Sequence, residues 1–260
     1  MIIKRSNSGR LSLLNLLQDH LYEKTSKSDM QKAFYIKRRG LTAIRAYLFI
    51  YSLISLFLMV YQLTDYHRLF AIPYWSFALQ TLYFGIVLIQ SIKGRKSTSY
   101  EGYYNIVGIL YELVFSFQFF NFLYFWLIVL PKEQQWNTSS FYNLAWLSVT
   151  VLSFIAIWIE QLFNMMKLHP KHILLVVSSV VGNMFLSKFV NFVTGRNVYF
   201  GEQFVFGEKF WVSLLLIAAP ALHFVIGNRH YQHKKHKKND RRKKLNEAIV
   251  SFKAVKDRAH

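Results

Sequence analysis

The sequence predicts an all-α, polytopic membrane helical bundle with six transmembrane helices and both termini in the cytosol. Two observations carry the prediction of a membrane bundle. Apolar residues make up 53% of the 260-residue chain, and aromatic residues make up 18%. The formal net charge is nevertheless +19. An apolar chain accommodates so many charges when its apolar residues lie in lipid and its charged residues lie in loops and tails.

Long apolar segments define the predicted helices. A helix needs roughly 20 residues to cross a bilayer core of about 30 Å. Six segments meet or approach this length: 43–63, 70–92, 104–130, 141–163, 173–194 and 210–226. The last is the shortest and contains Pro220. The chain therefore divides into a basic N-terminal segment at 1–42, a transmembrane domain at 43–226 and a polybasic tail at 227–260.

The basic residues predict the orientation of the helices. Cytosolic loops and tails of membrane proteins carry an excess of Lys and Arg. With six spans, 26 of the 32 Lys and Arg residues fall on the side of the two termini, and four fall on the opposite side. Both termini are therefore expected in the cytosol. The glycosylation sequon Asn137-Thr138-Ser139 then falls in a lumenal loop.

Both charged ends contain apolar stripes. The run HKKHKKNDRRKK at 233–244 predicts either a topology anchor or a contact with anionic lipid headgroups. Beyond it, Leu245, Ile249 and Phe252 share one helix face, and leucines within 13–21 do the same near the N-terminus. These helices are expected either on the cytosolic leaflet or against the protein's own loops. No domain that would present the charges to nucleic acid is evident, so nucleic acid is not an expected partner.

No metal or cofactor is expected from the residue types. The chain has no cysteine, which excludes disulfides, thiolate metal sites and cysteine nucleophiles. His169, Lys171 and His172 have side chains of the kind that binds metals, but no second cluster complements them. A surface loop is the better interpretation of these three residues.

Polar residues inside the spans indicate where helices meet. Ionisable groups at membrane depth are costly and point inward. Glu112 is expected either protonated or hydrogen-bonded inside the bundle, whereas Lys188 can extend toward the lumenal surface. Further candidates for hydrogen bonds between helices are Gln80, Gln118, Asn121, Thr150 and Asn183.

Several short motifs resemble one known family. They are YWSFALQTLYFGI at 74–86, Glu160 at the end of the fourth span, KLHP at 167–170 and GRNVYF at 195–200. Together with the six spans, they resemble the androgen-induced protein family, which includes the androgen-dependent tissue-factor-pathway-inhibitor-regulating protein. They resemble the rolling-stone membrane proteins more distantly. The resemblance implies an intramembrane hydrolase that cleaves fatty acid esters of hydroxy fatty acids with a Thr nucleophile and a His base.

The catalytic pair that this resemblance implies is not matched. In an alignment on Gln80, Pro73 occupies the position of the family's Thr, and in an alignment on Glu160, Thr150 occupies the position of the His. Ser76 lies one turn from Pro73 and is the candidate replacement nucleophile. The first five spans contain no His at lumenal or middle depth to act as its base.

The opening of the second span predicts a binding pocket. Ser76 and Gln80 are four residues apart and share one helix face. Helix rise places Gln80 and Thr150 at similar depth. We therefore expect a pocket open toward the lumenal leaflet that holds an acyl chain and is lined by Ser76, Gln80, Tyr83, Glu112 and Thr150.

Three functions fit these observations. The first is binding of a lipid acyl chain without catalysis, and the second is a divergent intramembrane lipid ester hydrolase. The third is a transporter, a channel or a subunit of an organelle membrane complex, but no internal repeat and few mid-span Gly or Pro residues support it. Membrane lipids are the expected partners. The expected location is the endomembrane system, as endoplasmic reticulum or plasma membrane, in preference to mitochondria, because Asp19, Glu23 and Asp29 interrupt the presequence-like N-terminus.

Overall fold

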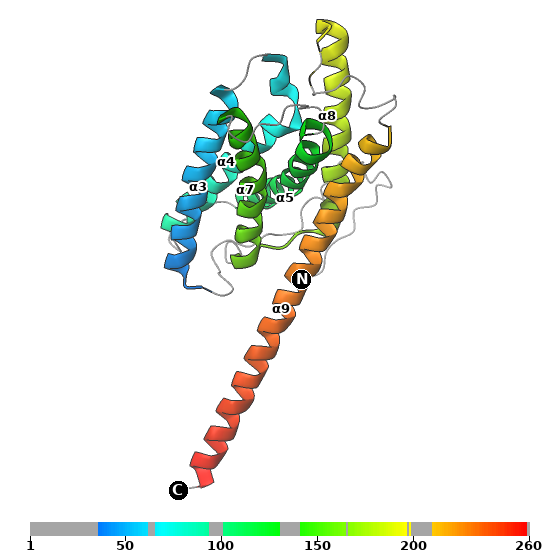
Figure 1. Ribbon diagram of the computed structural model, residues 1–260. Coiled ribbons are helices and arrows are strands. Elements are labelled where there is room, and N and C mark those ends of the chain that lie inside the picture. Colours follow the sequence, from blue (N-terminus) through cyan, green and yellow to red (C-terminus); the bar gives the residue numbers. More distant parts are fainter. Residues whose placement is uncertain are drawn as a thin grey trace, which may run out of the picture.

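Every element in the part of the chain that the structure describes is a helix. The computed structural model describes residues 36–61, 66–93, 101–130, 141–164, 166–196, 198 and 210–258 (Figure 1). The α-helices are α3 (Arg38–Tyr61), α4 (Ile72–Lys93), α5 (Glu101–Tyr124), α7 (Phe141–Phe163), α8 (Ile173–Thr194) and α9 (Phe210–Arg258). Two 3-10 turns, η1 (Tyr66–Phe70) and η4 (Pro170–His172), precede α4 and α8, and a π-helical turn, η3 (Phe125–Val129), continues α5.

The six predicted segments all occur as helices, so the all-α prediction is confirmed. The predicted bounds 141–163 and 173–194 coincide with α7 and α8. Four helices are long and apolar enough to cross a membrane: Arg38–Tyr61, Ile72–Lys93, Asn105–Ile128 and Pro170–Thr194. A shorter apolar helix covers Val149–Phe163. These lengths and compositions support an integral membrane protein.

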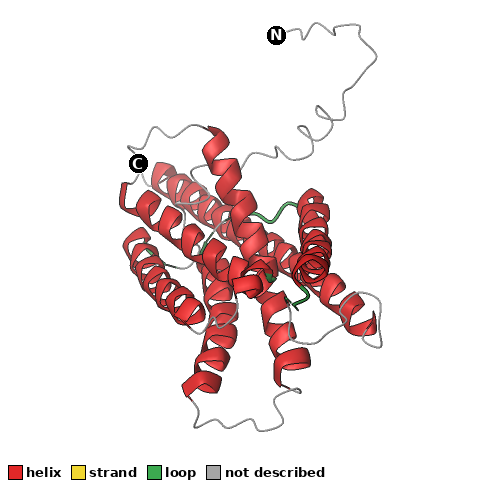
Figure 2. Ribbon diagram, turned by 90° about the horizontal axis from the view of Figure 1, so that it is seen from above, coloured by secondary structure: helices red, strands yellow, loops and turns green. Residues whose placement is uncertain are grey.

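Helix α5 lies at the centre of the bundle, where it contacts α4, α7, α8 and α9. In its apolar window, 67% of the residues are buried inside the protein, against 28% in α3 and in α8. The outer faces of α3 and α8 instead expose large apolar side chains, among them Ile50, Phe57, Phe185, Phe189 and Phe192. An exposed apolar face suits lipid chains. Figure 2 shows the same helices from above, joined by short loops where these are described.

The end of α8 has a local cause. Gly195 has φ 67°, in the left-handed region, and its N–H donates to the Asn191 carbonyl at 2.8 Å. A left-handed glycine at this position satisfies a carbonyl that the helix leaves free and stops the helix. The predicted boundary at Thr194 therefore follows from the glycine that comes next.

Helix α9 departs from the prediction. It continues through Pro220 for 49 residues, about 74 Å by helix rise, where a span ending at 226 and a separate tail helix were expected. Its second half projects from the bundle as a single arm (Figure 1). Leu245 and Ile249 of the predicted tail stripe are exposed on this arm. The leucines within 13–21 and the sequon at Asn137 lie outside the described residues.

Candidate functional site

A buried ion pair joins α3 to α7. Arg45 donates from Nε (3.0 Å) and Nη2 (2.6 Å) to Oε1 of Glu160, and both side chains are fully buried. Its Nη1 donates to Ser91 Oγ at 2.8 Å. The Tyr83 hydroxyl donates to the same Glu160 oxygen at 3.1 Å. This single carboxylate oxygen therefore connects three helices.

The ion pair fixes which faces of these helices meet. Removing two charges from water costs several kcal/mol per ion, and a partner charge with good hydrogen bonds offsets that cost. Arg45 and Glu160 satisfy each other only when α3 and α7 are correctly aligned. Oε2 of Glu160 has no hydrogen-bond partner among the residues that the structure describes.

The C-terminal end of α7 is held by α9. The Lys234 ammonium donates to the carbonyls of Gln161 and Asn164, the latter at 3.0 Å. Gln161 also accepts a hydrogen bond from the Tyr111 hydroxyl and donates to the Gly227 carbonyl at 3.1 Å. A lysine satisfies the last carbonyls of a helix and complements its dipole. Burial lowers the pKa of Lys234 to about 8, against the opposing effect of the Glu160 carboxylate.

Glu112 is hydrogen-bonded inside the bundle, which confirms that prediction. Its Oε1 accepts the backbone N–H of His169 at 2.6 Å, and its Oε2 contacts Nδ1 of His172. Both histidines are only 3% exposed, so the prediction of a surface loop was wrong for them, whereas Lys171 is exposed. The loop turns inward because a buried carboxylate needs donors. In the described part of the chain, no group of three His, Asp or Glu residues is arranged to hold a metal.

Ser76 is buried in a polar cluster without an acid or a base. Its hydroxyl donates to the Pro73 carbonyl at 2.8 Å and accepts from the Asn121 amide. Gln80 donates to Ser52 Oγ on α3 at 2.9 Å. A serine hydroxyl needs an adjacent base to act as a nucleophile. Neither hydrogen-bond partner of Ser76 can serve as one.

Three atoms around this cluster have no hydrogen-bond partner among the described residues. They are Gln80 Oε1, Gln118 Nε2 and Asn121 Oδ1. An unsatisfied buried polar group costs about 1–3 kcal/mol. These atoms are therefore the points in the cluster at which a polar group of a ligand would gain most.

The five residues of the predicted pocket are all buried, but they belong to different groups. Ser76 and Gln80 lie in the polar cluster of α3, α4 and α5, whereas Tyr83 binds Glu160 and Glu112 binds the histidine loop. Thr150 is buried on α7. None of the five lines either of the two cavities described below.

His223, near the cytosolic end of the predicted sixth span, is enclosed by aromatic rings. Its imidazole stacks on Phe115 with ring centroids 4.1 Å apart and on Phe119 at 4.6 Å. Phe154 and Trp158 complete the enclosure. His223 does not hydrogen-bond Ser76, so it does not supply the missing base.

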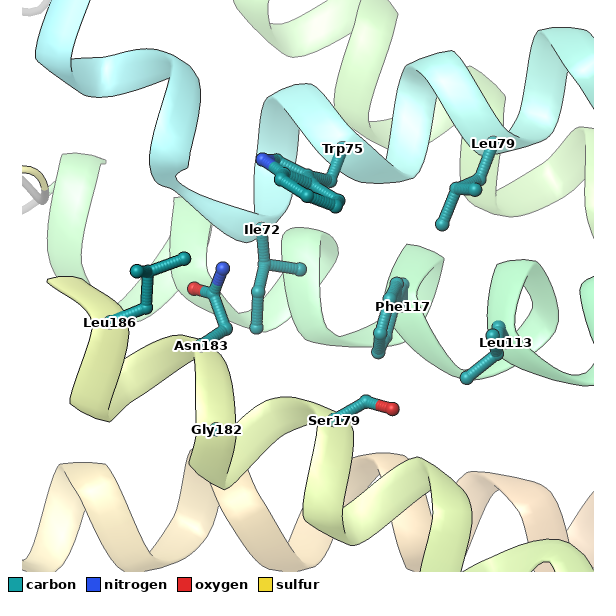
Figure 3. A pocket seen from close by; sticks show the side chains of 9 residues that line it. All are labelled: Ile72, Trp75, Leu79, Leu113, Phe117, Ser179, Gly182, Asn183 and Leu186. Atoms are coloured by element: carbon teal, nitrogen blue, oxygen red, sulfur yellow. The ribbon is translucent and has the colours of Figure 1, made fainter.

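The structure contains an apolar groove of 340 Å³ between α4, α5 and α8 (Figure 3). Residues of α8 form one wall, and residues of α4 and α5 form the other. The lining residues are Ile72, Trp75, Leu79, Leu113, Phe117, Ser179, Gly182, Asn183 and Leu186.

The polar groups of the groove are already engaged. Trp75 Nε1 donates to the Leu69 carbonyl at 2.8 Å, and Ser179 Oγ donates to the Leu175 carbonyl at 2.7 Å. Asn183 donates to the Phe70 carbonyl, also at 2.8 Å. Because these donors face backbone carbonyls, the groove presents mainly apolar surface to an occupant.

Two features of the site were missed by sequence reasoning. The groove uses residues 72, 75 and 79 of α4, each one position before 73, 76 and 80, so it lies about 100° around the helix from the predicted face. The ion pair of Arg45 and Glu160 had a visible signal, because both charges lie near the predicted cytosolic ends of their spans. Opposite charges at equal membrane depth are expected to pair.

Comparison with known proteins identifies no family for this chain. No protein-family model, no curated protein and no solved structure matches it.

Proposed function

We propose that this chain is a multi-pass membrane protein that binds the acyl chain of a lipid in the groove between α4, α5 and α8. The observation that carries the proposal is the groove itself, an apolar concavity of 340 Å³. Ligand sites are typically about 300–1,000 Å³ and mainly apolar, with few polar groups. A methylene chain needs no hydrogen bonds, so it suits a groove whose polar donors already have acceptors.

Trp75 supports a position of the groove near the lumenal leaflet. The ring lies at the start of α4, is 49% exposed and contributes to the lining. Tryptophan prefers the interface between membrane and water. The lipid head would then lie near Trp75, with the chain directed into the bundle between Phe117 and Ser179.

The same proposal includes six spans with cytosolic termini, in an endomembrane. The charge distribution supports it, since 26 of 32 basic residues lie on the side of the termini. The exposed lysines of the α9 arm, such as Lys235 and Lys237, are suited to anionic headgroups of the cytosolic leaflet.

A topology experiment has a clear expected outcome. A reporter fused after His260 is expected in the cytosol, and a tag inserted at 131–140 is expected in the lumen, because the excess of Lys and Arg favours a cytosolic location for both termini. Protease protection of sealed microsomes measures both positions. If the two tags are protected alike, the six-span arrangement is wrong.

The geometry supports lipid binding over ester hydrolysis, although the resemblance to the androgen-induced family suggests a hydrolase. Pro73 and Thr150 occupy the positions expected of the catalytic pair, and the Ser76 hydroxyl is hydrogen-bonded to the Pro73 carbonyl and the Asn121 amide, neither of which is a base. A weak nucleophile without a base gives little rate. We therefore propose binding without turnover.

Gly182 provides the test of the groove. A Cβ at this position would meet no atom within 4 Å, so a side chain there enters open space. Gly182→Leu is expected to fill the groove and reduce saturable photocrosslinking of a diazirine-bearing palmitate at least about tenfold, equivalent to about 1.4 kcal/mol. The measurement uses purified protein in nanodiscs, with unlabelled palmitate as competitor and crosslinked peptides mapped by mass spectrometry.

Two controls separate occupancy from general effects. Gly182→Ala changes the backbone preference at the same position but fills little of the groove. Leu174→Phe adds bulk to α8 at a residue that is 74% exposed and does not line the groove. Both are expected to bind palmitate like the unaltered protein. Equal binding by Gly182→Leu and Gly182→Ala would reject the groove as the site.

A further inference from the structure

We propose that a second cavity, between the starting turns of α3 and the end of α4, binds a phosphate-bearing anion. This site goes beyond acyl-chain binding and does not depend on it. The cavity measures 390 Å³ and is lined by Arg38, Arg39, Thr42, Ser91 and Ile92. It combines two guanidinium groups with a hydroxyl and one apolar edge.

Arg38 is fixed at the wall of the cavity. Its Nη2 donates to the Ser91 carbonyl at 2.8 Å across 53 residues of sequence. This bond immobilises the guanidinium between two helices and leaves its other N–H donors for a ligand. A positioned guanidinium binds phosphate oxygens better than a mobile one, because less freedom is lost on binding.

The charge around the cavity has one sign. Among the residues that the structure describes, no acidic residue lines the cavity, and the first turn of α3 contains none. Lys37 and Lys93 flank the lining residues in the chain. Arg45, which donates a hydrogen bond to Ser91 of the lining, is paired with Glu160, so the carboxylate of Glu160 is already neutralised by that arginine. An entering anion therefore meets uncompensated positive charge.

Ser91 shapes the cavity but does not supply a donor to it. Its Oγ accepts from Arg45 at 2.8 Å and donates to the Val87 carbonyl at 2.7 Å. The two arginines would then recognise the phosphate, because each planar guanidinium group can donate two parallel hydrogen bonds to phosphate oxygens. Ile92 gives the cavity an apolar edge, which suits a phosphate attached to glycerol or a similar carbon chain.

The proposed orientation places this cavity at the cytosolic edge of the bilayer. Basic pockets between helices on that side are suited to anionic headgroups. The same chemistry would also accept a soluble phosphate monoester. The ligand class is therefore a phosphate monoester, supplied either as a lipid headgroup or as a free molecule.

The test compares binding of two probes to the full chain in a neutral detergent. Short-chain phosphatidic acid represents the lipid headgroup, and glycerol 3-phosphate represents the free monoester. Native mass spectrometry measures retention of each probe, with phosphatidylcholine as the reference lipid. Retention of phosphatidic acid alone assigns a lipid headgroup, and retention of glycerol 3-phosphate as well assigns a site open to free monoesters. Retention of neither above the reference overturns the proposal.

A matched pair of double variants separates the cavity from overall charge. Arg38→Gln with Arg39→Gln is expected to weaken binding about twenty-fivefold, at about fivefold per basic residue. Lys235→Gln with Lys237→Gln removes the same charge from exposed positions on α9 and is expected to change binding little. Equal losses in the two double variants would show that net charge is responsible and would overturn the site.

A third variant guards against a folding defect in the arginine variant. Thr42→Asp keeps both arginines and adds a carboxylate to the cavity, four residues after Arg38, where an opposite-charge pair on one helix face stabilises the helix. Its thermal stability is expected to be unchanged or raised, while phosphate binding is lost. Unchanged binding by Thr42→Asp would contradict the proposal.

Discussion

Replacing Glu160 with Leu is expected to destabilise the folded protein by about 3–5 kcal/mol. The change leaves the fully buried Arg45 guanidinium without its counter-ion and removes the acceptor of the Tyr83 hydroxyl. A buried charge without a partner pays the full cost of desolvation. Thermal unfolding of the purified protein in detergent, followed by tryptophan fluorescence, measures the loss.

The double variant Arg45→Met with Glu160→Leu tests the reason for the loss. Replacing both members of a buried ion pair with apolar residues of similar volume is often neutral or stabilising. The double variant is therefore expected to recover most of the stability lost in Glu160→Leu. Failure to recover would show that the alignment of α3 and α7 depends on the pair itself.

An exposed carboxylate on the α9 arm provides the control. Glu247→Leu makes the same chemical change at an exposed position, and it is expected to alter the free energy of unfolding by less than about 0.5 kcal/mol. If Glu160→Leu unfolds at the same temperature as Glu247→Leu, the buried pair has no role in stability.

Hydropathy predicted the helices well because the length and apolar character of a span depend only on the residues of that segment. The bounds of α7 and α8 followed from the apolar run and its polar flanks, and Gly195 explains one end. The continuation of α9 past residue 226 could not be read in this way. The sequence becomes highly basic there, and contacts that the sequence does not reveal, such as those of Gly227 and Lys234 with α7, hold the helix against the bundle past this residue.

The contacts between helices were harder to predict, because they depend on which helices are neighbours. Glu112 was expected to need partners, but the sequence did not indicate that His172 would turn inward to reach it. The face of α4 that lines the groove could not be predicted for the same reason. The sequence predicted a pocket on the face of α4 that carries Ser76, but the groove lies on the adjacent face, which carries Trp75. The packing of α5 and α8 decides which face of α4 lines a cavity.

Gly227→Ala is expected to destabilise the protein by about 1–3 kcal/mol, the usual cost of overpacking. A Cβ at Gly227 would lie 2.5 Å from Leu168 Cδ1 and 2.6 Å from Phe115 Cε1, distances that atoms cannot keep. Alanine is favoured over glycine within a helix by about 1 kcal/mol, so helix propensity alone predicts the opposite sign. The prediction therefore separates close packing from propensity.

Gly182→Ala is the matched control, because this glycine also lies within a helix but has no neighbour within 4 Å of its Cβ position. It is expected to leave the unfolding temperature unchanged or to raise it. The Gly227 carbonyl accepts the Gln161 amide, so displacement of α9 at this point also releases the end of α7. Lys234 would lose its carbonyl acceptors, and trypsin cleavage within the arm is expected to accelerate in Gly227→Ala but not in Gly182→Ala. Equal unfolding temperatures and equal cleavage rates in the two variants would show that α9 does not pack against α5 at Gly227.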